Sequence, residues 1–282
     1  MVGSLCFTRL MTQCDELCTA IYLPFWRVDQ REPACWVNRL ASFQEDSKRP
    51  DRFSGRIPVV CIGGPSAVGK TSFTIQLAEA LSAIDIQVLV ICCDDYYRKN
   101  WRPHSRFGFD TMDAIDIDAL RSDLERVKQR SADSLRTYDM RTRAVARKAL
   151  NQSYELVLLE GAYGPQDLLE AGLINVFFYL DLPLWLRLVR RLRRDVQDRG
   201  RNPLQIIQQM LMHMIPGERA FIRPLRSASL LVITDLSQGK VSAIKVIQSL
   251  MTQRSPMWSS SGSIKWFDSD PAHLTAWKWK CH

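Results

Sequence analysis

Residues 64–71 form the segment that most constrains what this chain can fold into. They read Gly-Pro-Ser-Ala-Val-Gly-Lys-Thr, after the short apolar run 57–62 and before a helical pattern over 70–81. This order matches the pattern G-x-x-x-x-G-K-[ST] of a phosphate-binding loop (P-loop) between a strand and a helix. The strand–loop–helix context disfavours the alternative, a glycine-rich turn that only caps a helix. We therefore expect the chain to bind a nucleoside triphosphate.

The residue types of this loop each have a physical role toward phosphate. The glycines let backbone N–H groups curl around phosphate oxygens, and the following helix adds its N-terminal dipole. Lys70 is expected to reach the β- and γ-phosphates, and the Thr71 hydroxyl is expected to lie at Mg²⁺. The residues predicted to bind ATP or GTP in this loop are Gly64, Ser66, Ala67, Gly69, Lys70, Thr71 and Ser72.

Apolar strand-like runs alternate with helical patterns along the middle of the chain. The strand-like runs are 57–62, 87–93, 155–159, 176–180 and 230–234. The helical patterns are 70–81, 117–127, 184–199, 204–214 and 241–251. Continuous apolar strands of this kind are typical of a parallel sheet covered on both faces, so we predict an α/β fold of the P-loop NTPase type. In such sheets the ligand lies beyond the carboxyl ends of the strands.

Carboxylates follow three of these strand-like runs. Asp94 and Asp95 end the second run, Glu160 ends the third and Asp181 ends the fourth. Transfer of a phosphoryl group to an alcohol needs one carboxylate at the hydroxyl proton and another near Mg²⁺. The alternatives are solvated loop carboxylates for the aspartates and a strand-end cap for Glu160.

The predicted helix 184–199 is rich in arginine. Seven arginines lie between 187 and 201, and four of them at spacings of three, four and seven share one helical face: Arg187, Arg190, Arg191 and Arg194. Guanidinium groups suit phosphate oxygens, so this helix is expected to be a lid that closes over the nucleotide. The alternative is a solvated basic face.

Composition separates three zones and narrows the functional classes. We predict an N-terminal extension over 1–55, a nucleotide-binding domain over 56–252 and a C-terminal tail over 253–282. The eight cysteines lack paired metal-ligand spacing, and neither a secretory signal nor an apolar run of membrane length is present, which favours the cytoplasm. The net charge of +8 leaves nucleic acid as a possible partner, but no nucleic-acid-binding motif supports it.

The order of the motifs resembles the uridine kinase and phosphoribulokinase family of P-loop kinases over about residues 57 to 235. The series comprises the P-loop, Cys93-Asp94-Asp95-Tyr96-Tyr97, residues 109–116 (Phe-Asp-Thr-Met-Asp-Ala-Ile-Asp), Tyr138-Asp139, Glu160-Gly161 and the arginine-rich stretch 190–201. The combination is much more specific than any one of its members.

This resemblance implies roles for individual residues. Asp94 is implied to be the base that faces the acceptor hydroxyl, and Lys70 and Arg194 to stabilise the transferred phosphoryl group. Thr71, Asp94 and Glu160 are implied to surround Mg²⁺. Arg194 and Arg199 are implied to contact nucleotide phosphates. The residues implied to line the acceptor pocket are Tyr97, Phe109, Asp110, Tyr138, Arg191, Arg201 and Gln209.

Two departures from the pattern of uridine kinases, at Thr111-Met112 and at Arg143, leave the identity of the acceptor open. Thr111 and Met112 stand where those enzymes typically carry His-Pro, and Arg143 stands where they carry a histidine that helps to recognise the pyrimidine. A fixed cation at 143 suits a carboxylate or phosphate as readily as a pyrimidine carbonyl. The expected partner is a small-molecule acceptor, a nucleoside first and an acidic or phosphorylated polyol second. A non-catalytic nucleotide-binding regulator and a homo-oligomer stay open as well.

Overall fold

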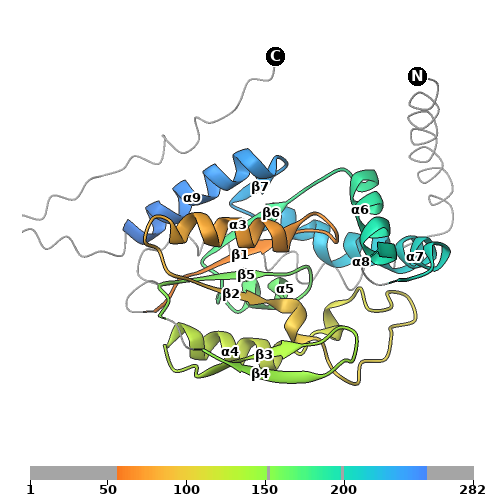
Figure 1. Cartoon of the computed structure of the whole chain (residues 1–282), viewed down its shortest axis with the longest axis horizontal. Helices are drawn as coiled ribbons and strands as arrows, with labels where there is room; N and C mark the ends of the chain where they lie inside the picture. Colours follow the sequence, from red (N-terminus) through yellow and green to blue (C-terminus); the bar gives the residue numbers. More distant parts are fainter. Residues whose placement is uncertain (1–55, 151–152, 198–199, 253–282) are drawn as a thin grey trace, which may run out of the picture.

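A five-stranded parallel sheet forms the centre of the molecule (Figure 1). The computed structural model describes residues 56–150, 153–197 and 200–252, so the predicted extension 1–55, the tail 253–282 and Arg199 lie outside the described residues. The strands are β1 (Val59–Gly63), β2 (Val88–Cys92), β5 (Leu156–Glu160), β6 (Val176–Leu180) and β7 (Leu231–Ile233), in the order β2-β5-β1-β6-β7. All four pairings are parallel, which confirms the predicted α/β fold.

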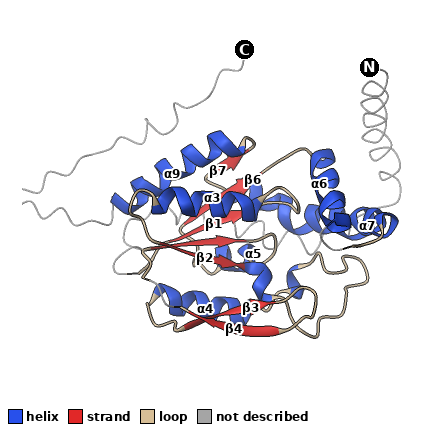
Figure 2. Cartoon of the chain, in the orientation of Figure 1, coloured by secondary structure: helices blue, strands red, loops and turns tan. Residues whose placement is uncertain are grey.

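Helices cover both faces of this sheet, as Figure 2 shows. On one face lie α3 (Lys70–Ser82) and α9 (Leu236–Thr252), which bury Phe73, Leu77 and Ile247 against the sheet. On the other face lie α4 (Ile117–Lys128) and α5 (Pro165–Glu170), which bury Leu120 and Leu168. Because apolar side chains are buried on both faces, β1, β5 and β6 are buried at every position, and this explains why they are apolar apart from Glu160 at the end of β5.

The arginine-rich segment after β6 is helical, and its second helix ends earlier than predicted. The helix α6 (Leu184–Gln197) begins where expected, and α7 (Pro203–Gln209) ends five residues early. A π-helical turn over Met210–Met214 follows it, then the short helix α8 (Ile215–Gly217), a second π-helical turn over Glu218–Ile222 and a 3₁₀ segment over Arg223–Ala228. None of the helices in the described ranges is long and apolar enough to cross a membrane.

The last helix is longer than its apolar pattern predicted, because a polar residue caps it. The prediction began at 241, whereas α9 begins at Leu236. The Asp235 carboxylate accepts hydrogen bonds from the backbone N–H groups of Ser237 and Gln238, at 2.8 and 2.9 Å. These bonds satisfy donors that a helix otherwise leaves open at its start.

An antiparallel hairpin, β3 (Ser134–Tyr138) and β4 (Val145–Ala149), was not predicted. Every side chain of β4 is exposed, so this strand lacks the apolar pattern that identifies a buried one. The hairpin is attached to the domain by ion pairs and backbone contacts. The Arg147 guanidinium lies 2.9 Å from buried Asp123, and the N–H of Tyr138 donates to Asp95 at 3.0 Å. The second contact positions Tyr138 beside the carboxyl end of β2.

Candidate active site

The P-loop joins β1 to α3, and at two of its positions the backbone adopts a conformation that favours glycine. Gly64 has φ of 139°, and a Cβ there would lie 2.4 Å from the carbonyl oxygen of Leu180. Gly69 has φ of 102° and precedes α3 without a side-chain cap. The first N–H groups of α3 therefore have no side-chain acceptor at the N-cap, and they form an anion-binding helix start. These features agree with the predicted phosphate-binding loop.

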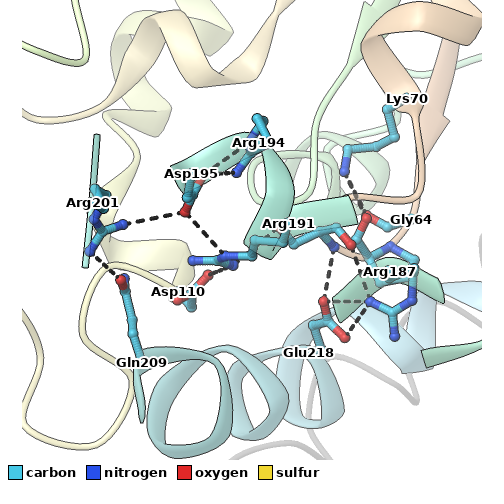
Figure 3. A network of polar contacts seen from close by, with 12 residues as sticks. Gly64, Lys70, Asp110, Arg187, Arg191, Arg194, Asp195, Arg201, Gln209 and Glu218 are labelled. Carbon is cyan, nitrogen blue, oxygen red and sulfur yellow. Dashed lines mark hydrogen bonds and ion pairs between the residues drawn. The ribbon is translucent and has the colours of Figure 1, made fainter. Parts of the chain in front are cut away.

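The lysine of the loop folds back across it. The Lys70 ammonium donates to the carbonyl oxygens of Gly64 and Pro65, both at 3.0 Å, as Figure 3 shows for Gly64. This ammonium is therefore held at the loop itself, where phosphate oxygens of a nucleotide are expected to replace the carbonyls as its partners.

Two carboxylates meet beside this loop because β2 and β5 are neighbours. Cys92, which ends β2, is in register with Glu160, which ends β5, and Asp94 follows two residues later. Glu160 accepts hydrogen bonds from the Thr71 hydroxyl at 2.8 Å and from the Cys92 thiol at 3.1 Å. Burial, and next the negative charge of Glu160, raise the pKa of Asp94 to about 6. The sheet topology thus places the three predicted metal-site residues close together.

This donor set fits Mg²⁺. Among the described residues no group of three or more His, Cys, Asp or Glu side chains could enclose a metal by itself. Mg²⁺ usually takes one or two carboxylates and completes its shell with water and phosphate oxygens, which is the set that Thr71, Asp94 and Glu160 offer. The mutual repulsion of the two carboxylates also favours a bound cation.

Replacing Glu160 by glutamine is expected to raise the Mg²⁺ concentration for half-maximal activity about tenfold or more. The amide keeps an acceptor for the Thr71 hydroxyl, so the change removes mainly the negative charge. The measurement is the rate of nucleotide consumption against Mg²⁺ concentration at saturating nucleotide. An unchanged Mg²⁺ dependence would remove Glu160 from the metal site.

A second polar group lies on the lid side of the site. Asp110 is buried, and one of its oxygens lies 3.7 Å from the Arg191 guanidinium. Its other oxygen, Oδ2, has no hydrogen-bond partner, and neither do Nε of Arg191 and the hydroxyl of Tyr163. Burial raises the pKa of Asp110, although Arg191 and His213 oppose the shift. Buried polar atoms without hydrogen-bond partners destabilise the folded state, so these atoms are candidates to bind a polar ligand.

Three arginines of the segment after β6 converge on one carboxylate to which the sequence motifs assign no role. Asp195 is completely buried, and Figure 3 shows Arg191, Arg194 and Arg201 around it, at 3.8, 2.9 and 3.4 Å. Arg201 also donates to Gln209 at 2.6 Å. Arg191, Arg201 and Gln209 are therefore brought together as predicted. Arg194 pairs with Asp195, and its contact with nucleotide phosphates stays a prediction.

The remaining predicted acceptor residues lie around the same region. A cavity of about 460 Å³ is lined by Phe109, Arg201 and Gln209 together with Gly108, Met212 and His213. The rings of Tyr97 and Tyr138 lie 6.0 Å apart. The Arg143 guanidinium lies over the Phe109 ring, 5.1 Å from its centre. Residues 97–143 thus face the segments 191–197 and 201–213 across the predicted acceptor site.

The sequence did not predict the buried ion pair between Arg187 and Glu218. Arg187 was predicted only as part of the basic face, yet its side chain is 8% exposed and its Nη1 lies 2.8 Å from Glu218. Glu218 in turn accepts from the backbone N–H of Ser66 at 2.9 Å, and Arg187 donates to the carbonyl oxygen of Ser66 at 3.2 Å. This pair fastens the P-loop to the lid and to the π-helical segment. No pattern in the sequence indicates that Arg187 pairs with Glu218, which lies 31 positions further along the chain.

Comparisons with known proteins agree with this geometry. The sequence model of the Phosphoribulokinase / Uridine kinase family matches residues 59–242. Uridine kinase of Staphylococcus aureus (strain JH9) is 28% identical over 207 residues, which are 70% of this chain and 98% of that protein. Uridine-cytidine kinase-like 1 of Mus musculus is 30% identical over 203 residues, 68% of this chain, and the match spans only 36% of the mouse protein.

A solved structure has the same fold. It comes from Silicibacter sp. TM1040 and is assigned to a fructose transport system kinase. Its TM-score is 0.52 at 17% identity, over 69% of this chain and 98% of that chain. The family match agrees with the P-loop and with the carboxylates at the strand ends, and together they classify the protein. The chain belongs to the phosphoribulokinase / uridine kinase family and is, as a member of it, a phosphotransferase with an alcohol as acceptor.

Proposed function

We propose that this protein transfers the γ-phosphate of ATP or GTP to a hydroxyl of a small molecule, in the first place a nucleoside such as uridine or cytidine. One observation carries the proposal. Glu160 accepts a hydrogen bond from Thr71 of the P-loop at 2.8 Å and is in register with Cys92, two residues before Asp94, so the phosphate-binding loop and both strand-end carboxylates meet at one place. The unpartnered oxygen of Asp110 lies in the adjacent polar group, where an acceptor hydroxyl could be held.

Each residue of the proposed mechanism acts on a defined atom. Asp94 accepts the proton of the acceptor hydroxyl while that oxygen attacks the γ-phosphorus, and the bond from this phosphorus to the β,γ-bridging oxygen breaks, so that the nucleoside diphosphate leaves. Lys70 and Arg194 stabilise the negative charge that spreads over the transferred group. Thr71, Asp94 and Glu160 would hold Mg²⁺, which would supply positive charge to neutralise the phosphate oxygens. The lid excludes water, which limits hydrolysis of the nucleotide.

The acceptor side supports a polyhydroxylated ligand. Asp110 offers a buried acceptor to a sugar hydroxyl, and Arg191 offers an N–H that lacks a hydrogen-bond partner. The Tyr97 and Tyr138 rings offer faces to a sugar or base. The printed names of the two curated relatives, uridine kinase and uridine-cytidine kinase-like, favour a nucleoside.

A second acceptor class, an acidic or phosphorylated polyol, is favoured by Arg143. Its guanidinium covers the face of Phe109 at 5.1 Å, so an aromatic base must displace it before that face can be used for stacking. A carboxylate or phosphate would instead pair with the guanidinium. Both acceptor classes use the same P-loop, carboxylates and lid.

The test is nucleotide consumption with Mg²⁺ and ATP or GTP across uridine, cytidine, sugar phosphates and hydroxy acids. Arg143→His is run beside the native chain. If the acceptor is a nucleoside, kcat/KM for it is expected to stay within a few-fold in this variant. If the acceptor is acidic, kcat/KM is expected to fall about tenfold or more, because a charge-assisted hydrogen bond is lost.

Other outcomes of this panel also decide between hypotheses. Nucleotide binding without turnover on any acceptor would contradict the kinase proposal and favour a nucleotide-binding regulator. Consumption without an acceptor would indicate hydrolysis instead of transfer. The cytoplasmic location and a homo-oligomeric state stay predictions.

A further inference from the structure

A cavity of about 560 Å³ lies where the ends of β6 and β7 meet the segment that follows α7. Pro65 of the P-loop is one of the residues that line this cavity. Tyr179 and Thr234, which carry hydroxyl groups, also line it. Six charged side chains line it: Asp181, Arg187, Glu218, Arg219, Arg223 and Arg226. We refer to this space as the basic cavity.

The charges of the basic cavity do not balance. Arg187 pairs with Glu218 at 2.8 Å, and Arg226 pairs with Asp181 at 3.2 Å, so both carboxylates are neutralised. The side chains of Arg219 and Arg223 are exposed, and neither guanidinium forms a hydrogen bond or ion pair with another residue of the described ranges. Four arginines against two carboxylates therefore leave two positive charges beside one cavity.

The basic cavity is separate from the nucleotide site. Nucleotide phosphates are expected at the start of α3, whose Phe73 and Leu77 pack against one face of the sheet. The basic cavity lies at the ends of β6 and β7, where Tyr179 of its lining packs in the apolar cluster of the opposite face and Leu182 packs against the cluster of the α3 face. The lining contains none of the residues predicted to bind the nucleotide.

We propose that the basic cavity is a second anion site, which binds a small molecule carrying two phosphate or carboxylate groups. Two unbalanced guanidinium groups match two anionic groups, and each can bind its partner in a forked, bidentate manner. Leu182 and Ile215 in the lining offer apolar contact to the carbon skeleton of such a ligand. The proposal concerns this site alone and does not depend on which acceptor is phosphorylated.

The basic cavity also touches the group that holds the P-loop. Arg187 lines the cavity and donates to the carbonyl oxygen of Ser66, while Glu218 accepts from the N–H of the same residue. A ligand in the cavity therefore contacts a side chain that is bonded directly to the nucleotide-binding loop.

Isothermal titration of the full chain without Mg²⁺ tests the proposal, with inorganic pyrophosphate in one arm and succinate in the other. Four proteins are compared: the native chain, Arg219→Gln/Arg223→Gln, Lys70→Ala and the charge-matched control Lys148→Gln/Lys245→Gln. Lys148 and Lys245 are exposed and lie outside the cavity lining, so the control removes two charges elsewhere. All four substituted cavity and control residues are exposed, so their folding is expected to be unaffected.

At least one of the two anions is expected to bind the native chain, the Lys70→Ala variant and the lysine control. Its affinity is expected to fall about a hundredfold or more in Arg219→Gln/Arg223→Gln, because two charge-assisted bonds are lost. The arm in which this occurs assigns the ligand to phosphates or to carboxylates. Equal affinity in the arginine variant and the lysine control overturns the proposal. Loss of anion binding in Lys70→Ala would also overturn the proposal, because it would assign all of the binding to the P-loop.

Discussion

Asp94→Asn is expected to lower kcat by about 100- to 10,000-fold, the usual contribution of a positioned general base. The amide has nearly the shape of the carboxylate but cannot take the proton of the acceptor hydroxyl. The effect should fall on kcat, because the P-loop residues that hold the nucleotide are unchanged. Steady-state kinetics give the rate, and titration with a non-hydrolysable ATP analogue measures nucleotide binding.

The neighbouring aspartate supplies a matched control. Asp95 accepts the backbone N–H of Tyr138 at 3.0 Å, and asparagine can keep that bond through its carbonyl oxygen. Asp95→Asn is therefore expected to retain activity within a few-fold. Equal losses in the two variants would indicate damage to the β2 end as a whole. Full activity of Asp94→Asn would remove Asp94 from the mechanism.

The fold was predictable wherever burial imposes a pattern on the sequence. β6 lies at its predicted residues, because a strand covered on both faces is apolar. β5 is displaced by one residue and includes Glu160, which is buried although it is charged. β4 is exposed at every position, so its sequence carries no such pattern. The start of α9 depends on the cap at Asp235 instead of on apolar spacing, and the prediction therefore began too late.

The residues of the candidate site also divide into those that the sequence predicted and those that it did not. Lys70, Thr71, Asp94 and Glu160 belong to strand ends and a loop that the sheet topology brings together, so motif and topology were enough to group them. Asp195 and Glu218 were not assigned, because their roles depend on arginines that reach them in three dimensions. An arginine-rich helix face does not reveal which guanidinium is buried against a carboxylate and which is exposed.

Arg187→Leu is expected to destabilise the folded state by about 3–5 kcal/mol, because it leaves Glu218 as a buried carboxylate without its cation. The two side chains are only 8% and 5% exposed, so solvent cannot compensate. The measurement is the free energy of unfolding from urea titration. Looser attachment of Ser66 should also weaken nucleotide binding, since Arg187 donates directly to its carbonyl oxygen.

The double variant Arg187→Leu/Glu218→Gln distinguishes an unpaired charge from lost packing. Glutamine removes the charge and keeps an acceptor for the Ser66 N–H, so we expect most of the lost stability to return. Burial raises the pKa of Glu218 in the folded state, and without Arg187 it is expected to rise further. A carboxyl with a raised folded pKa costs stability above that pKa and regains it as pH falls, since protonation removes the buried charge. The difference in unfolding free energy between the single and double variants should therefore narrow as the pH falls from neutrality toward the ordinary pKa of a glutamate carboxyl. A gap that does not change with pH would mean that the Glu218 charge is not the cause of the loss.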